Sequence, residues 1–242
     1  MNPYHSSVLG RLRQFYVYTP PDYEKNASAL YPALYLLHGA GDTEGEWTWH
    51  GRANHILDNL LADGKMRPMI VVMPFGHATN PNDFSAPRAR NTELFEADLK
   101  KDIIPRVEAK YRTAPGPANR AIAGLSMGGA QSINVGLSNL DLFGHIGVFS
   151  AGSGFGPGAR EEFEKRYQAV LADPAATNKK IRLLWIGCGE QDQLIQGAQQ
   201  LSDTLKQHGI THTFRTTPGA HTWIVWRRYL AEVAPLLFRP AS

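Results

Sequence analysis

Several features that define other classes of protein are scarce in this sequence of 242 residues. It contains one cysteine, Cys188, which excludes an intrachain disulfide and a cysteine-rich metal site. Cys188 ends the apolar run 183–188, and this setting is typical of a small buried residue rather than of a nucleophile. No apolar run approaches the roughly 18 residues that cross a bilayer. We therefore expect no membrane partner.

Charge of one sign is also scarce. The chain has 25 Lys and Arg against 22 Asp and Glu, for a net charge of +3, and the basic residues are scattered. A nucleic-acid partner is therefore not expected. His38, His50 and His55 lack the ligand spacing of a zinc site, and the glycines of 150–158 do not fit the dinucleotide fingerprint in register. We predict neither a metal nor a cofactor.

The chain starts Met1-Asn2-Pro3-Tyr4-His5. This start has no charged segment followed by an apolar one, so it does not read as a secretory leader. Two interpretations stay open: a cytoplasmic protein, or a chain whose leader is not part of this sequence.

Apolar segments alternate between two periodicities along the chain. Continuous runs and period-two patterns predict strands at 12–19, 32–37, 69–73, 120–123, 146–149, 181–186 and 211–216. Helical spacing predicts helices at 52–63, 93–111, 130–137, 160–172, 194–208 and 222–238. This order predicts one three-layer α/β domain over residues 1–242 with a mainly parallel sheet.

Three local expectations accompany this pattern. The first strand alternates and is expected to be an antiparallel edge. Pro105 is expected to kink the helix at 93–111. The loop 77–90 is long enough to be functional or mobile.

The most informative stretch is Gly124-Leu125-Ser126-Met127-Gly128. It matches G-x-S-x-G, in which a nucleophilic serine occupies a sharp turn between a strand and a helix. Glycines allow the backbone to pack closely around such a strained residue. An ordinary glycine-rich turn would look similar, but the flanking strand and helix favour a catalytic serine.

Position along the sheet selects partners for Ser126. In an open α/β sheet the site lies beyond the carboxyl ends of the strands, and in hydrolases with this turn an acid and then a histidine follow the serine. His221 follows the strand at 211–216 at that edge, whereas His208 ends a helix and His212 lies inside a strand. Asp192 follows the strand at 181–186, with Glu190 as the alternative acid.

These residues could support acyl transfer. Ser126 would attack a carbonyl carbon, His221 would take the proton, and Asp192 would orient the imidazole. The oxyanion needs preorganised donors. We expect the N–H groups of Met127, directly after the serine, and of Ala40, in the turn 38–41, to supply them.

Aromatic residues fall in or near loops at the same edge. Trp47, Trp49 and Trp223 are predicted to bind substrate, together with Phe75 and Phe155, as a flat apolar slot or by stacking on sugar rings. Core packing beneath the loops is the alternative for each of them.

The sequence resembles the esterase D-like, feruloyl esterase-type carbohydrate esterases of the α/β-hydrolase superfamily. The matching segments are Leu36-Leu37-His38-Gly39-Ala40-Gly41, Trp47, 51–54, 56–60, 69–74, 95–99, 102–105, 124–129, 185–189, His221-Thr222-Trp223 and Trp226-Arg227. They cover nearly the whole chain in order.

The resemblance implies an α/β-hydrolase fold without a large cap domain. It also implies Ser126, Asp192 and His221 as a triad and Ala40 and Met127 at the oxyanion hole. The expected activity is a serine esterase that releases ferulate or related hydroxycinnamates from plant cell-wall arabinoxylan, in a secreted or periplasmic setting. A small-molecule or polysaccharide ester is then the partner.

Three other activities stay open. They are an acetyl-xylan esterase, a general short-chain or thioester hydrolase of the S-formylglutathione type, and a non-catalytic carbohydrate-binding protein that has kept the fold. The oligomeric state does not follow from the sequence.

Overall fold

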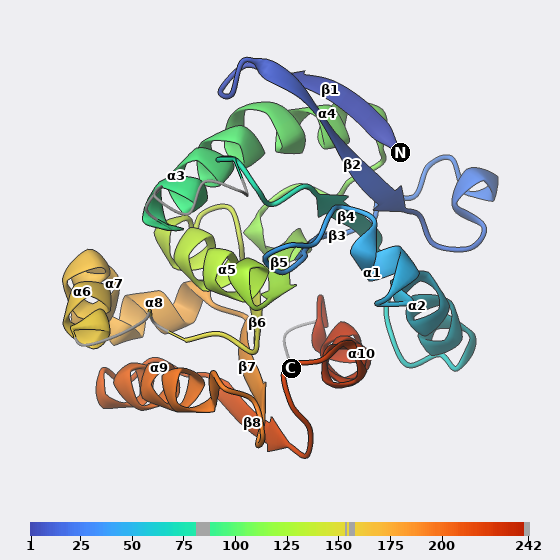
Figure 1. The fold of residues 1–242 in the computed structure, drawn as a ribbon. Coiled ribbons are helices and arrows are strands. Elements are labelled where there is room, and N and C mark those ends of the chain that lie inside the picture. Colours follow the sequence, from blue (N-terminus) through green and yellow to red (C-terminus); the bar gives the residue numbers. More distant parts are fainter. Residues whose placement is uncertain (81–87, 153, 155–157, 240–242) are drawn as a thin grey trace.

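The architecture is a twisted eight-stranded sheet with helices on both faces (Figure 1). The computed structural model describes residues 1–80, 88–152, 154 and 158–239. The strands are β1 (Asn2–Ser6), β2 (Arg11–Tyr18), β3 (Ala33–Leu37), β4 (Ile70–Pro74), β5 (Arg120–Leu125), β6 (His145–Phe149), β7 (Leu183–Gly189) and β8 (Thr213–Thr217). Their order in the sheet is β1-β2-β4-β3-β5-β6-β7-β8.

The sheet is parallel from β4 to β8 and antiparallel at its start. The predicted three-layer fold with a mainly parallel sheet is therefore confirmed. The first predicted strand, β2, is antiparallel but lies inside the sheet, because β1 pairs with it and forms the edge. Strand β1 has no clear strand pattern in the sequence, because its inward residues include the polar Asn2 and Ser6.

The helices are α1 (Glu46–Trp49), α2 (Ala53–Ala62), α3 (Arg88–Asp98), α4 (Ile104–Lys110), α5 (Met127–Ser138), α6 (Ala159–Arg166), α7 (Gln168–Ala172), α8 (Pro174–Lys180), α9 (Ile195–Gln207) and α10 (Trp223–Val233). Short helices α1 and α8 were not predicted, and the helix expected at 160–172 is divided at Tyr167 into α6 and α7. No helix among the described residues is long and apolar enough to cross a membrane.

Each buried strand packs its alternate residues into two separate cores. Tyr35 and Leu37 of β3 face a core that α3, α5 and α9 cover. Leu34 and Leu36 face the other core, under α1, α2 and α10. Figure 1 shows these two groups of helices on opposite sides of the sheet. A parallel sheet buried on both faces needs such continuous apolar strands.

The long helix expected at 93–111 is interrupted. A π-helical turn, η2 (Leu99–Ile103), separates α3 from α4, and the N–H of Ile104 donates to the carbonyl of Leu99. Pro105 follows at the start of α4, where its missing N–H costs no helical hydrogen bond. The disturbance predicted at Pro105 therefore takes the form of a wider turn before it. The helix also begins earlier than expected, at Arg88.

The parallel strands bring their carboxyl ends to one edge of the sheet, and close packing between β3, β5 and α5 shapes that edge. A Cβ added to Gly124 would lie 2.6 Å from the carbonyl carbon of Gly128. A Cβ on Gly128 would lie 2.5 Å from the carbonyl oxygen of His38. Only glycine allows this approach, so the turn between β5 and α5 sits directly against the turn after β3.

Candidate active site

Ser126 lies on a strained turn between β5 and α5. Its backbone has φ 52° and ψ −115°. Residues other than glycine rarely adopt this backbone conformation, which costs about 1–3 kcal/mol. The surrounding structure holds it there, because the Ser126 N–H donates to the carbonyl of Phe149 at 2.8 Å and the Ala130 N–H donates to the Ser126 carbonyl at 2.9 Å. The side chain is half-buried.

His221 connects Ser126 to Asp192. Its Nε2 lies 3.0 Å from Ser126 Oγ, and its Nδ1 lies 3.0 Å and 2.9 Å from the two carboxylate oxygens of Asp192. This arrangement assigns the Nδ1–H tautomer, in which Nε2 is free to accept the serine proton. Residues 95 and 29 positions apart in the chain thus form one hydrogen-bonded line.

The Asp192 carboxylate stays charged although its side chain is fully buried. Burial raises its pKa, but hydrogen bonds from His221, the Leu194 N–H and Ser150 outweigh this and leave the pKa below its usual value. The Leu194 N–H donates at 2.8 Å. A charged, well-hydrogen-bonded carboxylate is what stabilises an imidazolium on His221.

The alternative residues lie elsewhere. Glu190 is exposed. His208 lies 3.3 Å from Glu164 on α6, and His212 precedes β8 and lies 2.8 Å from Ser202 on α9. The structure therefore brings Ser126, Asp192 and His221 together and leaves the other candidates apart, while the catalytic roles stay a prediction.

The two expected oxyanion donors flank the serine. Met127 is the first residue of α5, so its N–H belongs to the positive end of the helix dipole. Ala40 is exposed in the turn after β3. A Cβ on the neighbouring Gly39 would lie 3.6 Å from the Cβ of Ser126, which places this turn beside the serine. The donor roles of both N–H groups stay a prediction.

A buried histidine supports that turn. His38 Nδ1 donates to the carbonyl of Gly39 at 2.8 Å, and His38 Nε2 accepts the N–H of Gly76 at 2.8 Å. Burial lowers the pKa of His38 to about 4, so the ring is neutral at physiological pH and can accept the Gly76 bond.

Sequence reasoning missed the segment after β4 that completes this side of the site. The Gly76 carbonyl accepts Nε2–H of Gln131 at 2.9 Å and Nδ2–H of Asn91 at 3.3 Å, and the same Asn91 nitrogen lies 3.8 Å from Met127 Sδ. Of the residues in this segment and its partners, only Gly76 is indicated by the sequence, as a glycine that follows the predicted strand. Its side-chain amide partners lie on helices α3 and α5, 15 and 55 positions further along the chain.

The predicted aromatic residues divide into buried and accessible ones. Trp47 is 1% exposed and its indole N–H donates to the carbonyl of Leu37 at 2.9 Å. This corrects the expectation that Trp47 contacts substrate, because its ring belongs to the core under α2 and α10. Trp49 is 53% exposed. Trp223 is half-buried and meets the Trp47 ring edge to face at 5.1 Å.

Phe75 and Phe155 complete the predicted set. Phe75 is half-buried and stacks on His38, with ring centroids 5.6 Å apart. Phe155 lies outside the described residues.

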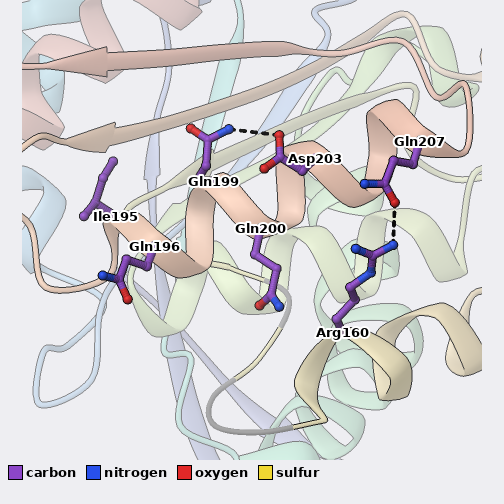
Figure 2. A pocket seen from close by; sticks show the side chains of 7 residues that line it. All are labelled: Arg160, Ile195, Gln196, Gln199, Gln200, Asp203 and Gln207. Atoms are coloured by element: carbon purple, nitrogen blue, oxygen red, sulfur yellow. Dashed lines mark hydrogen bonds between the residues drawn. The ribbon is translucent and has the colours of Figure 1, made fainter.

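A separate hollow of about 460 Å³ lies between α6 and α9 (Figure 2). Its lining is polar apart from Ile195 and includes none of the three candidate catalytic residues. Gln199 donates to Asp203 at 3.0 Å, and Arg160 donates to Gln207. Two pairs of the lining side chains are thus hydrogen-bonded to each other. The described residues contain no group of three or more His, Cys, Asp or Glu that could hold a metal ion.

A mainly parallel sheet with a serine elbow, and with its acid and histidine after later strands, defines the α/β-hydrolase fold. The family model described as "Putative esterase" matches residues 6–237. The chain belongs to this esterase family.

Individual relatives agree with this. A Xylanibacter ruminicola protein named endo-1,4-beta-xylanase/feruloyl esterase is 34% identical over 238 residues, which are 97% of this chain and 30% of that protein. An esterase of Mycobacterium tuberculosis is 29% identical over 266 residues, covering 91% of this chain and 55% of that one. The chain thus spans less than a third of the first relative and about half of the second.

A solved structure shares the fold over almost the full length. It is a ferulic acid esterase of Anaeromyces mucronatus in complex with ferulic acid. The TM-score is 0.83 at 25% identity, over 98% of this chain and 89% of that one.

Proposed function

We propose that this chain is a serine carboxylic-ester hydrolase that releases ferulate or a related hydroxycinnamate from arabinoxylan-type carbohydrate. The observation that carries the proposal is the line Ser126–His221–Asp192, with contacts of 2.9–3.0 Å on a strained elbow, in a chain of the esterase family. The feruloyl part draws support from the names of the relatives and of the solved ferulic acid esterase.

In the acylation step, Ser126 Oγ attacks the ester carbonyl carbon while His221 Nε2 takes the hydroxyl proton. The N–H groups of Met127 and Ala40 bind the oxyanion, and each such donor contributes roughly 3–4 kcal/mol to transition-state stabilisation. The intermediate collapses when His221 gives its proton to the leaving sugar oxygen.

In the deacylation step, a water molecule is the nucleophile instead of Ser126. His221 removes its proton, the water oxygen attacks the acyl carbon, and ferulate leaves as Ser126 regains its proton. Asp192 keeps the Nδ1–H tautomer throughout and stabilises the imidazolium in both steps.

Accessible aromatic side chains are consistent with binding of an extended substrate. Trp49 and the half-buried Trp223 lie on α1 and α10. The Arg227 guanidinium of α10 donates to the carbonyl of His50 at 2.6 Å, which fixes these two helices against each other. Aromatic faces of this kind bind hydroxycinnamoyl rings or stack on sugars.

A substrate panel tests the proposal. The chain is assayed on methyl ferulate, feruloylated arabinoxylan oligosaccharides, p-nitrophenyl acetate and S-formylglutathione, with Ser126→Ala as control. We expect the highest kcat/KM on the feruloyl esters. A preference for the acetyl ester or the thioester would reject the feruloyl assignment but keep the hydrolase.

Labelling separates the enzyme from a non-catalytic protein. A serine-directed phosphonate is expected to modify Ser126 in the wild type and to leave the Ser126→Ala chain unlabelled. Absence of label on the wild type, together with no ester hydrolysis, would reject the enzymatic proposal and favour a carbohydrate-binding role.

A further inference from the structure

Trp226 of α10 packs directly against the imidazole of His221. The two rings meet edge to face, with centroids 4.9 Å apart and an interplanar angle of 87°. The Trp226 side chain is buried, at 6% exposed, so it excludes water from this side of the imidazole. His221 is therefore held by a ring contact as well as by its hydrogen bonds to Ser126 and Asp192.

The sheet fixes the indole of Trp226. Its Nε1–H donates to Ser150 Oγ at 2.9 Å, and a buried indole N–H needs such an acceptor. Ser150 follows β6, is fully buried and has φ 51°, in the left-handed region that favours glycine. Its N–H donates to the carbonyl of Gly187 at 2.7 Å. The acceptor for the indole is thus itself bonded to the sheet.

Trp226 also packs against Trp223, three residues earlier in the chain. The two indoles meet edge to face, with centroids 5.3 Å apart and an interplanar angle of 84°. Trp223 contacts the fully buried Trp47 in the same way, at 5.1 Å. The rings of His221, Trp226, Trp223 and Trp47 therefore form one continuous series from the candidate base into the core.

The hydrogen bonds of His221 change during the proposed reaction, whereas its contact with Trp226 does not. In the resting state His221 Nε2 lies 3.0 Å from Ser126 Oγ. Once Ser126 carries the acyl group, its oxygen has no proton to donate, and this hydrogen bond is lost. The bond to Asp192 and the ring of Trp226 then have to keep Nε2 directed at the attacking water.

We propose that Trp226 is a positioning residue for His221 and that it matters most when the hydrogen bond to Ser126 is absent. Its ring, fixed by Ser150 and Trp223, holds the imidazole in line with Asp192. The kinetic part of this role rests on the proposed function, because it concerns the acyl-enzyme of that mechanism.

Trp226→Leu tests the role, since it removes the ring and keeps an apolar side chain. Deacylation should slow more than acylation. We expect kcat to fall about tenfold and kcat/KM by no more than about threefold. A p-nitrophenyl ester should then give a burst of p-nitrophenol, because the acyl-enzyme accumulates.

Three further variants separate positioning from packing. Trp226→Phe keeps a ring but loses the indole N–H, and Ser150→Ala removes its acceptor. Each should lower kcat less than Trp226→Leu, and the double variant should be no slower than Trp226→Phe, because both changes remove the same hydrogen bond. Trp185→Phe is the matched control, since Trp185 is a fully buried tryptophan that packs on Tyr229 of α10 at 5.1 Å. It should lower Tm without producing a burst.

NMR measures the positioning without turnover. In Ser126→Ala, which lacks the serine hydroxyl, the His221 Nδ1–H proton is followed in protein with ¹⁵N-labelled histidine. Its exchange with water should stay slow in Ser126→Ala and become about tenfold faster or more when Trp226→Leu is added. This readout tests the inference even if the wild type hydrolyses none of the esters above, a result that would reject only the proposed function.

Two results would overturn the positioning role. One is an Nδ1–H proton that exchanges equally slowly with and without Trp226→Leu. The other is an equal fall of kcat and kcat/KM in Trp226→Leu with no burst, which would mean that the ring only stabilises the fold.

Discussion

The imidazole of His38 accepts the backbone N–H of Gly76 at 2.8 Å and so joins the turn after β3 to the segment after β4. The bond requires an unprotonated Nε2, and burial favours that state by lowering the His38 pKa to about 4. His145 on β6 is similar: burial, with a smaller contribution from Arg182, lowers its pKa to about 4.

These two histidines predict acid sensitivity of the fold. Between about pH 6.5 and pH 4 the unfolded chain binds protons that the folded chain does not, so the free energy of unfolding falls as the pH falls through this window. Each histidine contributes at most on the order of 3 kcal/mol. Urea unfolding at pH 7.5, 5.5 and 4.5 measures the fall. His145→Gln should make this fall smaller, and a slope equal to that of the wild type would contradict this.

The candidate triad predicts non-additive losses. Ser126→Ala should lower kcat by about 10⁴-fold or more, and the further change His221→Ala should cost little, because the residues act as a unit. Single-turnover assays on a feruloyl ester measure both variants. Independent, multiplying losses would mean that Ser126 and His221 do not share one step.

The close packing at the serine turn predicts that alanine substitutions at Gly124 and Gly197 change the stability in opposite directions. Gly124→Ala places a Cβ 2.6 Å from the Gly128 backbone and 2.8 Å from the Leu37 Cβ, so it should destabilise by several kcal/mol, as overpacked cores do. Gly197→Ala is the control, since its Cβ meets nothing closer than 3.8 Å in helix α9. It should stabilise by about 0.5–1 kcal/mol. Equal melting temperatures for the two variants would refute the packing argument.

A buried ion pair supports the segment after β4. Arg13 Nε lies 3.0 Å from Asp98 Oδ2, with both side chains almost fully buried, and Arg13 donates to the carbonyls of Phe75 and His77. Asp98→Asn leaves the guanidinium without its countercharge and should cost about 3–5 kcal/mol in denaturant unfolding. Lys25→Ala, in an exposed pair with Asp22, should leave the unfolding midpoint unchanged.

The two tryptophans of α1 predict opposite phenotypes. Trp47→Ala empties a fully buried site and should lower the free energy of unfolding by about 3–5 kcal/mol. Trp49→Ala should leave stability unchanged but raise KM for feruloyl oligosaccharides more than for p-nitrophenyl acetate. An unchanged KM on every ester would remove Trp49 from the proposed substrate surface.

Local patterns were enough for most of the elements but not for their ends. The runs at 32–37 and 69–73 predicted β3 and β4 within a residue or two, because a strand buried on both faces must be continuously apolar. The helix at 93–111 was predicted as one piece, since its apolar spacing is continuous across η2 and only backbone hydrogen bonding distinguishes a π turn. The sequence does not predict strand β1, because an edge strand needs little apolar surface.

The sequence alone determined the order of strands β2 to β8 and of most helices, the serine turn, and the choice of His221 and Asp192, with Glu190 as the alternative acid, as partners for Ser126. Each depends on local periodicity or on the rule that parallel strands end at one edge. Only the tertiary structure decided the burial of Trp47, the hydrogen bond between His38 and Gly76, and the hydrogen bond between Trp226 and Ser150. These contacts join residues from separate strands and helices, and no spacing along the chain encodes which side chains meet when the layers pack.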